Sequence, residues 1–362
     1  MNEAAGLCRR FQNRGRVPIS VAALAYDDRV KTPVRRSAIF TFLLLANFSS
    51  YGASEPDEFP QAVISNGIVT AKLYLPDAQR GYYRATRFDW SGVIPDLKWK
   101  GHSYFGKWFT KYDPKIHDAI MGPVEEFLTN GVDLGYAEAQ PGGTFVKIGV
   151  GILRKPDEPE FRQFETYQIV DNGVWTTSSK SDSVTFTHSL RDNASGYGYA
   201  YTKVVRLTPG KPELVLEHTL RNTGAKPIDT DVYEHDFYML DGQPSGPAIV
   251  VRFPFEVKAA MDLGDKAATR GKDLVYLREL QGRESVYSEL RGYGAETGDN
   301  DIRVENSSTG AGVREIGSRP LSKLVYWSIR ATACPEAYVH LSVDPGKETS
   351  WKITYQFYEI AH

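Results

Sequence analysis

The sequence predicts an all-β protein, a large antiparallel β-sandwich with few short helices. From about residue 59 onward, apolar and polar residues alternate over short runs, the pattern of strands with one buried face. Turn signals of Gly, Pro and Asn separate these runs at intervals of roughly 10–15 residues. The composition agrees, because 21 Tyr, 32 Gly and 20 Pro against only 4 Met favour strands and turns over helices.

The first predicted element is a β-hairpin over residues 62–75. Asn66-Gly67 lies between two alternating runs, and Asn-Gly in this position is a strong hairpin signal. A strand punctuated by glycines is expected over residues 143–153. Later strands, separated by turns such as Pro209-Gly210, are expected over residues 184–188, 200–207, 213–221, 249–257 and 350–360.

Short helices are predicted at residues 113–120, at 123–130 and within 274–281. The second of these contains Glu125 and Glu126 near its start. Acidic residues in the first turn of a helix are favoured by the helix dipole, so we interpret them as capping residues. The alternative is that one of the two lines a cleft.

Residues 1–53 differ from the remainder of the chain. Basic residues between 31 and 36 precede an apolar run over 38–48, and small residues lead to a cleavage site near Ala53. We interpret residues 1–53 as an N-terminal extension followed by a signal peptide at about 31–53, with the natural start near residue 30 or 34. The alternative is a buried N-terminal helix. The prediction is a periplasmic or secreted protein without a membrane span in its mature form, because the run is shorter than the ~20 residues of a transmembrane helix.

No Ser-, Pro- or Gly-rich linker and no short repeat divides the rest, so residues 54–362 are predicted to form one sandwich domain. The chain has 43 basic and 45 acidic residues, a balance that argues against nucleic acid as a partner. It has 2 Cys and 7 scattered His, and it lacks a phosphate loop and a dinucleotide fingerprint. We therefore expect neither a metal nor a cofactor.

One segment, residues 213–242, carries a more specific pattern. A strand ends in Asn-Thr-Gly, and the next strand carries His235, followed by aromatic residues and by Leu240-Asp241-Gly242. This arrangement resembles the galactose mutarotase-like (aldose 1-epimerase) superfamily. Members usually have Asn immediately before this His, whereas this chain has Glu234.

A second point of resemblance lies near the C-terminus. Glu336 takes the position of the catalytic Glu that superfamily members carry on a late strand. A Pro345-Gly346 turn and a last strand that contains Tyr355-Gln356-Phe357 follow in the same order. The resemblance spans residues 59–360 and implies a β-supersandwich of the mutarotase type, with a mono- or oligosaccharide as partner.

The resemblance implies that Glu336 is the base and His235 the acid of the reaction. Interconversion of anomers needs a base at the anomeric hydroxyl and an acid at the ring oxygen, with the roles then reversed. The alternatives are a hydrogen-bonded strand histidine and a surface carboxylate.

Substrate-binding candidates lie in several segments. Arg84 and Arg87 belong to an aromatic-rich stretch, where arginine forks can bind hydroxyls or a carboxylate and aromatic faces can stack on a sugar. The superfamily has a further early His, for which His102 and His117 are candidates, with His102 in the more suitable Gly-flanked segment. Tyr233 and Trp327 complete the candidate set.

The predicted function is therefore a cofactor-free, aldose 1-epimerase-like activity. Two alternatives stay open, because a fold does not determine a function. One is a non-catalytic carbohydrate-binding protein. The other is a polysaccharide lyase or hydrolase in which Tyr233, His235 and an arginine handle a uronic acid.

Overall fold

The structure is a computed structural model and describes residues 59–360. Over this range the chain is folded into strands, and its two helices are short 3-10 turns, η1 (Leu240–Gly242) and η2 (Thr297–Asp299). The all-β prediction is confirmed. No helix within the described range is long and apolar enough to cross a membrane. The predicted extension and signal peptide lie outside the described residues and stay predictions.

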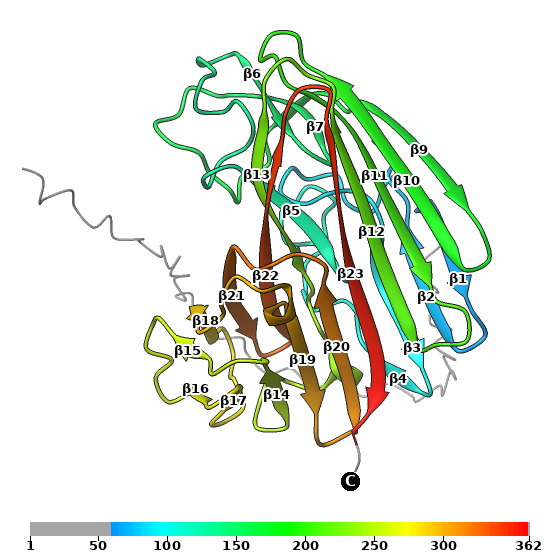
Figure 1. The fold of residues 1–362 in the computed structure, drawn as a ribbon, viewed down its shortest axis with the longest axis vertical. Coiled ribbons are helices and arrows are strands. Elements are labelled where there is room, and N and C mark those ends of the chain that lie inside the picture. Colours follow the sequence, from blue (N-terminus) through cyan, green and yellow to red (C-terminus); the bar gives the residue numbers. More distant parts are fainter. Residues whose placement is uncertain (1–58, 361–362) are drawn as a thin grey trace, which may run out of the picture. The chain divides into compact units, whose positions relative to one another are not determined.

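The largest sheet has ten strands, and each neighbouring pair is antiparallel. Its long central strands run side by side in Figure 1. In spatial order the strands are β16 (Ala267–Arg270), β17 (Asp273–Tyr276), β14 (Ile249–Arg252), β19 (Asp301–Asn306), β20 (Ala311–Gly317), β23 (Glu348–Glu359), β12 (Glu213–Asn222), β11 (Gly198–Leu207), β10 (Ser183–Arg191) and β9 (Val174–Ser179).

The second sheet has six antiparallel strands and carries the candidate site. In spatial order they are β15 (Lys258–Ala259), β18 (Ser285–Arg291), β21 (Lys323–Ile329), β22 (Thr332–Val343), β13 (Ile228–His235) and β5 (Val124–Leu128). The two sheets face each other, because hydrogen bonds cross between them. Tyr355 on β23 donates to Asp236 just after β13, and Tyr276 on β17 donates to Ser328 on β21.

Two smaller sheets complete the fold. One contains β1 (Gln61–Ser65), β2 (Val69–Tyr74), β3 (Val93–Trp99) and β4 (His102–Ser103), and the other contains β6 (Thr144–Lys147), β7 (Gly151–Arg154) and β8 (Gln168–Asp171). The predicted hairpin is β1–β2, and Gly67 adopts a left-handed φ of 82° in its turn. The predicted strand over 143–153 is instead two paired strands, β6 and β7.

The predicted helices are wrong. Residues 113–120 form turns and bends, β5 occupies the second segment, and the third contains most of β17. In β5 all five residues are buried, because one face meets the ten-stranded sheet and the other lies under loops. A strand buried on both faces lacks the alternation that identifies strands in a sequence. The strand predicted over 249–257 is also shorter, since β14 ends before Pro254, which cannot donate a ladder hydrogen bond.

Candidate active site

A cavity of about 370 Å³ lies on the face of the six-stranded sheet that points away from the ten-stranded sheet. Side chains of neighbouring strands reach it because residues two apart on a strand share a face. Loop residues close its other side. The strand residues include Tyr233 and His235 on β13, Glu336 and Tyr338 on β22, and Lys323 and Trp327 on β21.

His235 and Glu336 form the chemical centre of this cavity. The imidazole Nε2 lies 3.6 Å from Glu336 Oε1, and both side chains are almost fully buried. His235 is the last residue of β13, and the paired ladder between β13 and β22 ends earlier, at Val232 and Val339. Pro335 next to Glu336 is paired with Tyr326 of β21 on one side and has no ladder partner on the β13 side, where a missing N–H is tolerated.

The Glu336 carboxyl has a pKa raised to about 7. Burial is the main cause; the Arg87 guanidinium opposes the shift, and the negative charge of Glu126 adds to it. The Tyr338 hydroxyl donates to Glu336 Oε2 at 3.2 Å and orients the carboxyl. Near neutral pH, Glu336 therefore exists in both its protonated and its ionised form.

The imidazole of His235 lies in an aromatic enclosure. Its ring stacks on Phe237 with 3.9 Å between centroids, and Trp327 meets it edge-on at 5.4 Å. Phe237 has a φ of 48°, which is rare for an aromatic residue, and this turn directly follows the end of β13. Burial, assisted by the charge of Arg87, holds the pKa of His235 well below its usual value. This environment favours the neutral imidazole at pH 7.

Arg87 forms one wall of the cavity and is held by two carboxylates. Its Nε donates to Glu126 Oε2 at 2.9 Å, and its Nη1 donates to Asp118 Oδ1 at 2.5 Å. Glu126 also accepts hydrogen bonds from the Tyr233 hydroxyl, at 2.5 Å, and from the Gln163 amide, at 2.7 Å. Such a network fixes the guanidinium and the phenol in place relative to the His235–Glu336 pair.

Five of the seven candidate residues come together at this cavity: His235, Glu336, Arg87, Tyr233 and Trp327. The structure does not bring Arg84 and His102 to it. Arg84 donates to the backbone carbonyl of Gln79, and His102 pairs with Asp241 at 2.9 Å beside η1. His102 begins the short strand β4 of the four-stranded sheet, and a Gly-flanked aromatic stretch carries no information on which sheet it joins.

Sequence reasoning missed several cavity residues. Glu126 was expected to cap a helix, with a position at a cleft as the alternative; it lies on β5, where it holds Arg87 and Tyr233 at the cavity wall. Lys323 and Tyr338 could have been found by counting two residues along the strands from Val325 and Glu336. Asp118 and Gln163 come from segments outside the strands and show no pattern that could have predicted them.

Another cavity, of about 390 Å³, lies at the loop between β7 and β8. Its most buried acidic group, Glu158, is engaged with its neighbours: it accepts from the hydroxyls of Tyr136 and Tyr167 and lies 3.8 Å from Arg162. Its lining has no imidazole paired with a carboxyl, so we place the candidate chemistry in the cavity of His235 and Glu336.

Comparison with known proteins supports the fold assignment. No family model and no curated protein matches this chain. A candidate aldose 1-epimerase from Escherichia coli K12 superimposes with a TM-score of 0.51 at 12% identity, over 83% of this chain and 100% of that one. The Slr1438 protein from Synechocystis sp. PCC 6803 gives a TM-score of 0.50 at 12% identity, over 84% of this chain and 97% of that one.

The chain has the galactose mutarotase-like fold.

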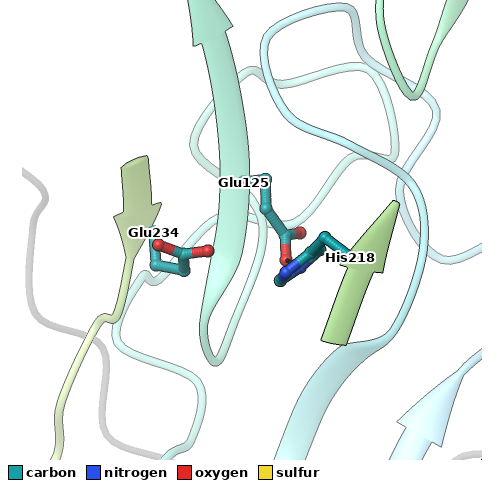
Figure 2. A group of neighbouring side chains, drawn as sticks. All are labelled: Glu125, His218 and Glu234. Atoms are coloured by element: carbon teal, nitrogen blue, oxygen red, sulfur yellow. Dashed lines mark hydrogen bonds and ion pairs between the residues drawn. The ribbon is translucent and has the colours of Figure 1, made fainter. Parts of the chain in front are cut away.

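Between the two large sheets of this mutarotase-like sandwich lies a group of buried ionisable residues. Glu125 and His218 point toward each other, and Glu234 reaches the same space from β13 (Figure 2). Their ligand atoms lie within 4.8 Å of one another, so they could in principle hold a metal ion. However, Lys203 Nζ lies 2.6 Å from one oxygen of Glu125, and His218 Nε2 lies 2.7 Å from the other. The lysine already supplies the positive charge, and the donor set fits an ion pair better than a metal centre.

The buried carboxyls in and around this group fall into two kinds, according to the direction in which their pKa is shifted. For Glu125, burial alone would raise the pKa, but the charge of Lys203 and the hydrogen bond from His218 lower it to about 2. For Asp89 and Glu315, burial raises the pKa to about 7, and for Glu234 and Asp236 burial raises it further. Among these five carboxyls, Glu125 is therefore held ionised beside Lys203, whereas burial favours the protonated form of the other four.

This arrangement predicts that Glu315→Gln becomes relatively more stable as the pH rises. The folded protein holds the Glu315 proton up to about pH 7, whereas the unfolded chain releases it near the ordinary value of 4.5. The contribution of the Glu315 carboxyl to the free energy of unfolding is fully present below pH 4.5 and is lost as the pH rises through about 7. Between pH 5 and 8, the difference in unfolding free energy should shift by about 2 kcal/mol in favour of the variant.

Urea unfolding of both proteins at several pH values measures this shift. The exposed Glu348 on β23 provides the control, and Glu348→Gln should show little pH-dependent difference. A constant difference between wild type and Glu315→Gln would show that Glu315 is ionised throughout this range.

Proposed function

We propose that this protein is a cofactor-free aldose 1-epimerase that opens and closes the ring of a mono- or oligosaccharide. The observation that carries the proposal is the His235–Glu336 pair, an imidazole and a carboxyl 3.6 Å apart that face one cavity. A cavity of about 370 Å³ is within the range of small-molecule sites, roughly 300–1,000 Å³. The similar structure from Escherichia coli K12 is named as a candidate aldose 1-epimerase, which supports this proposal.

The proposed reaction uses one proton shared by the pair. The pKa values place this proton mainly on Glu336, and the reacting form is the one in which it has moved to His235. In that form the carboxylate takes the proton of the anomeric hydroxyl while the imidazolium protonates the ring oxygen. Ring opening leaves Glu336 protonated and His235 neutral. After rotation about the bond next to the carbonyl carbon, the same two groups act in reverse, and closure gives the other anomer.

The surrounding residues bind and orient the sugar in this proposal. Arg87 and Tyr233 are fixed by Glu126, so their donors present a rigid surface to sugar oxygens. Trp327 offers an aromatic face that can stack on the apolar face of a pyranose. Arg87 is paired with Glu126 and Asp118, so part of its charge is compensated within the cavity wall.

The direct test is anomer exchange. Purified protein should accelerate equilibration of freshly dissolved aldoses, followed by polarimetry or by the anomeric proton signals in NMR. Exchange at the uncatalysed rate for a panel of neutral and acidic aldoses would contradict the proposal.

The proposed mechanism also predicts a specific pH profile. The reactive form of the pair carries one proton. Activity is therefore lost at low pH, when a second proton binds, and at high pH, when the last proton leaves. Because the pKa of Glu336 is raised to about 7 and that of His235 is lowered, kcat/KM should be highest below pH 7. Above an apparent pKa of about 7 it should fall about tenfold per pH unit. A profile that rises through pH 7 and stays high would instead indicate that Glu336 acts as a base without a protonated His235.

A further inference from the structure

We propose that the cavity selects an aldose that carries an anionic group, and that Lys323 binds this group. The inference rests on the proposed function and extends it to the class of substrate. Lys323 is the first residue of β21 and lines the cavity together with Glu336. Neither the predicted set of site residues nor the proposed ring-opening step uses it.

Lys323 lies beside the aromatic ring of Tyr338, which also lines the cavity. It pairs with Tyr338 across the β21–β22 ladder, and its ammonium lies 3.9 Å from the centroid of the Tyr338 ring. The side chain is only partly buried. This cation–π contact holds the ammonium at the cavity wall while leaving its N–H groups available for a ligand.

The charges around the cavity are unevenly matched. Arg87, the other basic residue of the lining, is ion-paired with Glu126 and Asp118. For Lys323, no acidic side chain among residues 59–360 lies within 4 Å of the ammonium. A cation without an ion-pair partner in a partly enclosed cavity favours an anionic ligand, because its charge is only partly hydrated there.

The position of Lys323 relative to the reacting groups fits one sugar ring. Val325 is opposite Glu336 in the ladder, and Lys323 is opposite Tyr338, so the backbone of Lys323 lies in a row two residues further along the sheet. Its ammonium stays at that row, against the Tyr338 ring. Two residues along a strand span roughly 7 Å. This is comparable to the distance across a pyranose from the anomeric hydroxyl to a group on the exocyclic carbon. With the anomeric centre at His235 and Glu336, a carboxylate or phosphate on that carbon would meet Lys323.

Methyl glycosides provide a test that does not depend on catalysis, because their methylated anomeric oxygen prevents ring opening. Binding of methyl glucuronide, methyl 6-phosphoglucoside and methyl glucoside to the full chain would be measured by calorimetry or by NMR titration. The two anionic glycosides share the charge, and the comparison between them identifies whether carboxylate or phosphate is preferred. At least one of them should bind 10-fold or more tightly than the neutral glycoside.

Two substitutions separate the charge from the fold. Lys323→Gln should abolish the preference and leave the affinity for methyl glucoside within about threefold, whereas Lys323→Arg should keep the preference. The control is Lys258→Gln, which removes the same charge from an exposed lysine on β15 of the same sheet. Equal affinity of the wild type for anionic and neutral glycosides, no detectable binding of any of them, or a preference that persists in Lys323→Gln would overturn the proposal.

The outcomes distinguish this proposal from the proposed function. Tight binding of an anionic glycoside that depends on Lys323, without acceleration of anomer exchange for the corresponding free sugar, would support the anion site and contradict the epimerase. Acceleration of exchange with neutral and anionic sugars at equal kcat/KM would support the epimerase and overturn the role of Lys323.

Discussion

Glu336→Gln is expected to lower the rate of anomer exchange by about 10²–10⁴-fold, the range for loss of a general acid–base group. The amide has nearly the same shape as the carboxyl but cannot accept and return a proton. Because the pKa of Glu336 is already raised to about 7 by burial, a neutral side chain is tolerated at this position, and the fold should be retained. Polarimetry at pH 6 to 7 measures the loss.

A matched control distinguishes loss of chemistry from loss of charge on the sheet. Glu289 is an exposed carboxylate on β18 of the same sheet, and Glu289→Gln should keep wild-type exchange. The Glu336→Gln variant should also bind methyl glycosides as the wild type does. Unchanged exchange in Glu336→Gln would remove Glu336 from the proposed pair, and sugar binding by a wild type that shows no exchange would favour the carbohydrate-binding alternative.

Lys203→Met is expected to destabilise the protein by about 3–5 kcal/mol, the cost of leaving a buried charge without its partner. The ammonium of Lys203 lies 2.6 Å from Glu125 and 3.0 Å from the carbonyl oxygen of Ser91, and neither Lys203 nor Glu125 is exposed to solvent. Without the lysine, Glu125 must either stay ionised among protonated carboxyls or take up a proton. Denaturant unfolding at pH 7 measures the loss.

The double variant Lys203→Met/Glu125→Gln tests the cause. It removes both charges, so it should recover part of the lost stability, and the two effects should not be additive. Lys98, which pairs with Asp96 on the exposed surface of β3, is the control, and Lys98→Met should change stability only marginally. A loss for Lys203→Met as small as that of the control would show that the buried pair is not needed for the fold.

The segment at Glu125 and Glu126 shows why some elements could not be predicted. Both acids are fully buried on β5, one facing the sandwich interior and the other facing the cavity wall. Adjacent charged residues within an apolar run indicate a helix end when only local preferences are considered. Their stabilising partners, Lys203 and Arg87, are distant in the sequence, so the strand becomes favourable only when those partners are in place.

His102 and Lys323 show the same limit for the site. A histidine in a Gly-flanked aromatic segment was a reasonable candidate, but pairing of β3 with β4 places it beside η1. Lys323 could not be predicted from the sequence, because a single lysine at the start of a strand carries no motif. Its importance follows from the neighbouring strand, which places Tyr338 under its ammonium and Glu336 one row away.

The sequence by itself determined the all-β class, the first hairpin and the identity of His235 and Glu336 as candidates. Alternation, turn residues and short motifs are local features, and a chain records them directly. The tertiary structure decided which side chains meet, because β13, β22 and β5 are brought together from distant parts of the chain. Burial in that assembly also decided the protonation of Glu336 and His235, since the cost of a charge depends on the solvent that folding removes.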